Sequence, residues 1–141
     1  MRLLALFLAS VLTLIAALHF YWAAGGRSAS AAVVPEMNGR PTIQPGPLAC
    51  SAVGVLLVLA ARLWLGRGGA LRLPGPRWLS AAGSWAVGGI LALRAIGDFR
   101  FFGLFRRVTG TSFARNDARY YTPLCVLLAA GALCVAWLAE G

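Results

Sequence analysis

Hydrophobic residues gather into four long runs separated by shorter polar or proline-rich segments. The runs lie at residues 3–24, 48–65, 78–96 and 122–139. A helix needs about 20 mainly apolar residues to cross the hydrocarbon core of a bilayer, and these runs are close to that length. The pattern therefore predicts an all-α, polytopic membrane protein with four transmembrane helices, forming a single membrane domain over residues 1–141.

The first run is compatible with a secretory signal peptide or with a retained helix. A signal peptide has an apolar core of about 7 to 15 residues and ends at a small-residue cleavage site. This run is longer, and it closes on His19, Phe20, Tyr21 and Trp22. Aromatic clusters of this kind are typical of a membrane interface. We therefore predict a retained helix.

Proline separates the runs, because it lacks an N–H and cannot continue a helix. Residues 25–47, between the first two runs, are predicted to form a short ordered loop around 33–36 and 40–43. Residues 66–76 are predicted to form a basic hinge. Thr122 suits a helix N-cap and Pro123 a first helical turn, so the fourth helix is predicted to begin there.

Small residues recur every four positions in two of the predicted helices, which creates faces that allow close helix packing. This spacing predicts contact between the first and third helices. The residues are Ala5, Ala9, Thr13 and Ala17 in the first helix, and Ser80, Ser84, Gly88 and Ala92 in the third.

Composition supports a membrane protein and restricts its partners. The chain is 60% hydrophobic and 12% charged, with a net charge of +9 from thirteen arginines and no lysine. Soluble domains carry about 25% charged residues. A basic chain can bind nucleic acid, but these arginines flank apolar runs, where positive charge usually contacts anionic headgroups. We expect a lipid bilayer, with anionic lipid or a membrane protein as further partner, and no nucleic acid.

The segment 91–125 concentrates the polar chemistry, and its first feature is Arg94 followed four residues later by Asp98. This spacing places both residues on one helical face, where they can form an ion pair. Such a pair near a membrane often marks a functional site. The alternative is a helix end at which the arginine extends to the interface and the aspartate caps nearby backbone groups.

Residues 100–108 show a second feature, an amphipathic pattern. On a helical wheel, phenylalanines and aliphatic residues share one face, while Arg100, Arg106 and Arg107 share the other. This pattern predicts a short interfacial helix before the fourth span. Together with Arg115, these arginines are candidate ligands for anionic lipid headgroups. The alternative is anchoring without lipid selectivity.

His19 is the only histidine in the chain. No second nitrogen ligand accompanies it, and no catalytic or metal-binding signature is found, so we expect no metal, no cofactor and no catalytic residues. Cys50, Cys125 and Cys134 have no metal-ligand spacing and are expected to be packing residues. The alternative role for His19 is proton handling together with Asp98.

Three stretches resemble the signatures of a family of bacterial membrane proteins known as domain of unknown function 3995. They are residues 19–26 (HFYWAAGG), residues 93–100 (LRAIGDFR) and residues within 106–125 (RRVTGTSFARNDARYYTPLC). The resemblance covers nearly the whole chain, including the proline-rich loop. It implies a four-helix integral protein of the cell membrane and brings no assigned activity.

Four membrane crossings would bring the three stretches to one face of the membrane. We therefore predict a polar cluster at that face, in which Asp98 pairs with arginines of its own loop. Two functions fit this prediction: a non-enzymatic module that binds lipid or a membrane partner, and a small transporter or membrane enzyme that handles protons. The predicted cluster contains His19, Tyr21, Trp22, Arg94, Asp98, Arg119 and Tyr120.

Overall fold

The computed structural model describes residues 1–26, 33–37, 40–42 and 45–140. Within this part of the chain, four helical stretches are long and apolar enough to cross a membrane, which confirms the predicted fold class. The last stretch covers residues 112–138 and is built from three successive elements. The first three stretches are the helices α1 (Arg2–Ala23), α3 (Pro47–Arg67) and α4 (Arg77–Ile96). The last stretch consists of α5 (Ser112–Asn116), a π-helical turn η1 (Asp117–Tyr121) and α6 (Thr122–Leu138).

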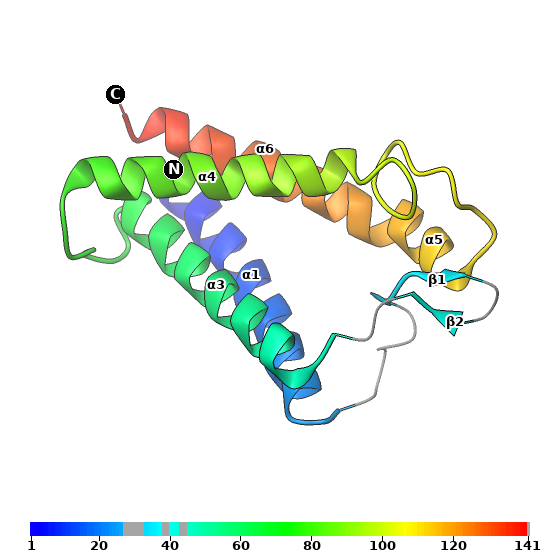
Figure 1. The fold of residues 1–141 in the computed structure, drawn as a ribbon. Helices are drawn as coiled ribbons and strands as arrows, with labels where there is room; N and C mark the ends of the chain where they lie inside the picture. The colour runs from blue at the N-terminus through cyan, green and yellow to red at the C-terminus, as the bar shows by residue number, and fades with distance from the viewer. Residues whose placement is uncertain (27–32, 38–39, 43–44, 141) are drawn as a thin grey trace.

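The helices form two antiparallel hairpins, α1 with α3 and α4 with α6 (Figure 1). The hairpins meet at the end of the molecule that carries both termini and diverge toward the other end. Their shared core contains Leu8 of α1, Trp64 of α3, and Leu128 and Val135 of α6, all of which are buried. Alanines between these large side chains let the helices approach closely.

The predicted contact between the first and third helices is wrong. Ala5 and Ala9 are buried as predicted, but α1 packs chiefly on α3. Ser84 and Gly88 are also buried, and a Cβ at Gly88 would lie 2.7 Å from a methyl group of Leu133 in α6. Each small-residue face therefore packs on the next membrane-spanning helix in the chain, because consecutive elements are usually neighbours in space.

The fourth span begins earlier than predicted, at Ser112. Thr111 is the N-cap, and its hydroxyl oxygen accepts a hydrogen bond from the Ala114 N–H. Thr122 lies inside the span, and its N–H donates to the Asp117 carbonyl five residues back. Pro123 follows and has no N–H to donate. A π-helical turn at this point accommodates the missing donor and the proline ring, which an unbroken α-helix would not.

The loop between α1 and α3 is ordered in the part that the structure describes. β1 (Glu36–Met37) pairs antiparallel with β2 (Arg40–Pro41). The Thr42 N–H and hydroxyl both donate to the Pro35 carbonyl oxygen and close this short hairpin. Ile43, which was predicted to belong to the same ordered loop, lies outside the described residues.

Gly68 directly follows the last residue of α3 and lies against the start of α1. A Cβ at this residue would overlap the Cβ of Ala5, which has no side-chain freedom with which to move away. We expect Gly68→Ala to destabilise the fold by about 1–3 kcal/mol through overpacking, measured as a lower midpoint of thermal unfolding in detergent.

Gly89→Ala is the matched control, because no atom lies within 4 Å of a Cβ built at Gly89 in α4. That variant should be neutral or more stable, since alanine favours a helix over glycine by about 0.5–1 kcal/mol. Equal unfolding midpoints for the two variants would contradict the packing described here.

Candidate functional site

The carboxylate of Asp117 is the centre of the polar segment. Its side chain is 0% exposed. Arg94 at the end of α4 donates to Oδ1 at 2.7 Å. The Gly103 N–H and the Thr122 hydroxyl each donate to Oδ2 at 2.8 Å. The Arg106 guanidinium lies 3.6 Å from Oδ2, which completes a ring of donors around one buried anion.

This cluster carries a net positive charge, because two guanidinium groups surround a single carboxylate. Arg94 also lies over the ring of Phe102, 4.4 Å from its centroid. Arg106 donates a second hydrogen bond, to the Gly103 carbonyl oxygen at 2.8 Å. A buried charge is tolerated only when it is paired and hydrogen-bonded, and both oxygens of Asp117 meet that requirement.

Two glycines allow the loop between α4 and α5 to fold back onto the end of α4. Gly97 and Gly103 have φ values of 95° and 88°, and a Cβ on either one would overlap the backbone of the other segment. The Leu104 N–H then donates to the Ala95 carbonyl at 2.9 Å. The returning loop segment therefore donates to a carbonyl at the end of α4 and brings the Gly103 N–H to Asp117.

The predicted ion pair between Arg94 and Asp98 is wrong, since Arg94 pairs with Asp117. Asp98 instead accepts backbone N–H groups from the three residues 100–102, at 3.0, 2.7 and 3.1 Å. The alternative interpretation of Asp98 as a backbone cap is confirmed. Partial burial raises the pKa of Asp98, but the three amide hydrogen bonds outweigh it and hold the pKa below the ordinary value of 3.8.

The predicted interfacial helix over residues 100–108 is wrong, because this segment is an irregular loop. Gly97 and Gly103 turn the chain through backbone conformations that a helix does not contain. Phe99 and Phe105 nevertheless lie side by side on the surface, 57% and 59% exposed, with ring centroids 5.9 Å apart. The two exposed phenylalanines therefore lie together on the surface although the segment is not helical.

Four of the arginines in this region are exposed, and two of them lie over neighbouring aromatic rings. Arg100 is 4.9 Å from the ring centroid of Phe101, and Arg119 is 5.3 Å from that of Tyr120. Arg106 differs from the others, because its side chain is only 19% exposed and points to Asp117. The exposed arginines are Arg100, Arg107, Arg115 and Arg119. We call these four, together with exposed Phe99, Leu104 and Phe105, the arginine–aromatic surface.

The predicted cluster divides into two separate groups. His19 lies near the end of α1, where its Nδ1 is 2.8 Å from the Ile15 carbonyl oxygen and its ring lies 5.2 Å from that of Trp22. Figure 1 shows this end of α1 well apart from the end of α4, because the hairpins diverge there. His19, Tyr21 and Trp22 therefore lie apart from Arg94, while Asp98 is in the same loop as the Asp117 cluster.

Asp117 was not among the predicted site residues. Its signal in the sequence is its place as the only acid between residues 99 and 139, in a stretch that holds five arginines. A lone acid among arginines is a natural candidate for a shared partner. The involvement of the Gly103 N–H and the Thr122 hydroxyl depends on the loop reversal and the π-turn, which spacing alone does not predict.

Comparison with known proteins identifies the family. Residues 12–132 match the model of the family described as Protein of unknown function (DUF3995), so the chain belongs to that family. No curated protein and no solved structure matches this chain.

Removing the Asp117 carboxylate should destabilise the α4–α6 hairpin. We expect Asp117→Ala to cost about 3–5 kcal/mol, because it leaves the Arg94 charge unpaired in a partly buried position. Thr122→Val is the control within the same cluster, since it removes one donor and should cost about 1 kcal/mol. Thermal unfolding in detergent measures both, and similar losses for the two variants would contradict the central role of the carboxylate.

The Asp98 cap should show a pH dependence of defined sign. Because the pKa of Asp98 is lowered in the folded protein, its stabilisation of the loop is present above the ordinary value of 3.8 and is lost as pH falls below it. Amide exchange of residues 100–102, corrected for intrinsic rates, should therefore accelerate at acid pH. Asp98→Asn should lose protection at neutral pH and lack this acid transition. An unchanged transition in Asp98→Asn would assign it to another group.

Proposed function

We propose that this protein is a non-enzymatic module of the cell membrane that binds anionic lipid headgroups through its arginine–aromatic surface. The observation that carries the proposal is that four exposed arginines and the exposed Phe99, Leu104 and Phe105 all lie within residues 99–119, between the end of α4 and the start of α6. Arginine guanidinium groups bind phosphate oxygens in a bidentate manner. Phenylalanine and leucine side chains beside them suit the acyl boundary just below the headgroups.

Rigidity of the loop supports selective binding over unselective anchoring. Asp117 fixes the loop from inside through Arg94 and the Gly103 N–H, and Asp98 fixes the turn at residues 100–102. Donors that are held in place before binding lose less conformational entropy when a ligand arrives. A surface that is ordered in this way favours a headgroup whose oxygens match its donors.

Charge favours anionic lipid over a membrane protein as the occupant of this surface. The four exposed arginines are accompanied by one exposed carboxylate, that of Asp98, which already accepts three backbone N–H groups. The surface therefore keeps a strong excess of positive charge at the membrane boundary. Anionic lipids supply matching charge at the same depth, and each arginine near such a membrane contributes about 1 kcal/mol.

The alternative, proton handling by His19 and Asp98, has less support. The two residues belong to separate groups at the diverging ends of the hairpins. Three amide hydrogen bonds hold Asp98 in its charged form, and its lowered pKa makes it a poor proton acceptor near neutral pH.

Neutralising the arginine–aromatic surface tests the proposal. We expect the triple variant Arg100→Gln, Arg107→Gln, Arg115→Gln to lose most of the preference for phosphatidylglycerol over phosphatidylcholine. Native mass spectrometry of the protein in mild detergent with both lipids measures this preference directly. A fall of about tenfold or more corresponds to the loss of about 1.4 kcal/mol of binding free energy.

The matched control is the triple variant Arg2→Gln, Arg62→Gln, Arg72→Gln. It also removes three positive charges, but from exposed arginines at the other end of the helices. This variant should keep most of the preference. An equal loss in both variants would reduce the effect to net charge, and no loss in the first would refute headgroup binding at this surface.

A further inference from the structure

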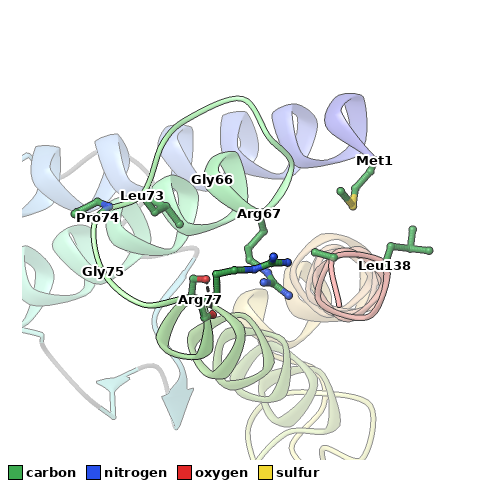
Figure 2. A pocket seen from close by; sticks show the side chains of 10 residues that line it. Met1, Gly66, Arg67, Leu73, Pro74, Gly75, Arg77 and Leu138 are labelled. Carbon is green, nitrogen blue, oxygen red and sulfur yellow. Dashed lines mark hydrogen bonds between the residues drawn. The ribbon is translucent and has the colours of Figure 1, made fainter. Parts of the chain in front are cut away.

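A cavity of about 420 Å³ lies at the end of the bundle opposite the arginine–aromatic surface. Figure 2 shows that it lies between the end of α3, the connection that follows it, the start of α4 and the end of α6, with Met1 nearby. Met1, Leu73 and Leu138 provide apolar parts of its wall. The cavity is therefore built where the two hairpins meet.

Two arginines from different helices give this cavity its charge. Arg67 ends α3 and Arg77 begins α4, and Figure 2 shows their side chains extending toward the same space beside α6. Among the residues that the structure describes, no acidic side chain lines the cavity. Among the described residues, neither arginine forms an ion pair. Two like charges that share a space without a carboxylate repel each other, and an anion between them would relieve that repulsion.

The donors of Arg67 are incompletely satisfied. Its Nη2 makes one long hydrogen bond, 3.4 Å to the Ala136 carbonyl oxygen. Its Nε is buried and has no hydrogen-bond partner in the part of the chain that the structure describes. A buried donor without a partner is rare in folded proteins because it forfeits its hydrogen bond to water. Arg67 therefore keeps donor capacity on its guanidinium beyond the one long hydrogen bond to Ala136.

The start of α4 contributes Arg77 and Ser80 to the same wall. The helix follows Pro76 as N-cap, and no side chain caps its first N–H groups. The Ser80 hydroxyl, which lines the cavity one turn later, donates to the Arg77 carbonyl. Uncapped N–H groups and the helix dipole favour an anion at such an end.

We propose that this cavity binds a phosphate group, supplied by a phospholipid headgroup or by free phosphate. Two guanidinium groups and a helix N-terminus form a donor set that suits phosphate oxygens. The volume exceeds that of one phosphate, and the apolar wall leaves room for the glycerol part of a lipid. The cavity and the arginine–aromatic surface lie at opposite ends of α4, so this site is independent of the function proposed above.

Inorganic phosphate is the first probe. We expect sodium phosphate to raise the thermal unfolding midpoint of the full chain in neutral detergent, relative to sodium chloride at equal ionic strength. Arg77→Gln should abolish this difference. Arg72→Gln should retain it, because Arg72 is exposed in the same connection and does not line the cavity. Equal responses of wild type and both variants would overturn the proposal.

Native mass spectrometry with phosphatidylglycerol and phosphatidylcholine then distinguishes the two sources of phosphate. If a lipid headgroup is the ligand, Arg77→Gln should weaken retention of one phospholipid by about tenfold, or about 1.4 kcal/mol. A response to inorganic phosphate alone would assign the site to free phosphate. An Arg77→Gln variant that matches wild type with every probe would exclude both.

The triple loop variant separates this site from the proposed function. Arg100→Gln, Arg107→Gln, Arg115→Gln should keep the phosphate-dependent rise in the unfolding midpoint, since those residues lie at the other end of the helices. Arg67→Gln should weaken phosphate binding as well, and circular dichroism controls for the loss of its bond to Ala136. A phosphate response that disappears in the loop variant but persists in Arg77→Gln would place the anion at the loop and refute the cavity site.

Discussion

The need to satisfy one buried carboxylate organises the whole polar end of the second hairpin. Asp117 is fully buried, so both of its oxygens must receive donors from the protein. Those donors come from α4, from the loop and from the first turn of α6. The carboxylate thus ties three segments together, and the loop keeps its shape although it contains no regular secondary structure.

Local backbone geometry adapts to this requirement. The π-helical turn places Asp117 and Thr122 so that the Thr122 hydroxyl reaches Oδ2, and it also accommodates Pro123. Gly97 and Gly103 let the loop backbone pass close to the end of α4, and this brings the Gly103 N–H to Oδ2 of Asp117. π-turns inside helices frequently occur at functional sites, and this one carries Arg119 of the arginine–aromatic surface.

The sequence predicts the four spans and most of their boundaries, because the length of an apolar run is set by bilayer thickness. It predicts the wrong partner for Arg94, because i,i+4 spacing considers only neighbours on one helix and therefore selects Asp98. The loop after α4 folds back and brings Asp117 to Arg94, which local spacing does not predict. It also predicts a helix at residues 100–108 from side-chain periodicity alone. Gly97 and Gly103 override that periodicity, because their positive φ values are required where the loop backbone passes close to the end of α4. The sequence also predicts that the last span starts at Thr122, because a proline usually marks the first turn of a helix. In the structure a π-turn accommodates Pro123 inside the span.

The division into two hairpins has a consequence for biogenesis. All the groups that neutralise Asp117 belong to the second hairpin, within residues 94–122. As that hairpin leaves the ribosome, its buried charges can be matched before it meets the first hairpin. The second hairpin can therefore enter the bilayer with the Asp117 carboxylate already paired. Association with the first hairpin then adds mainly apolar contacts, together with the hydrogen bond from Arg67 of α3 to the Ala136 carbonyl oxygen of α6.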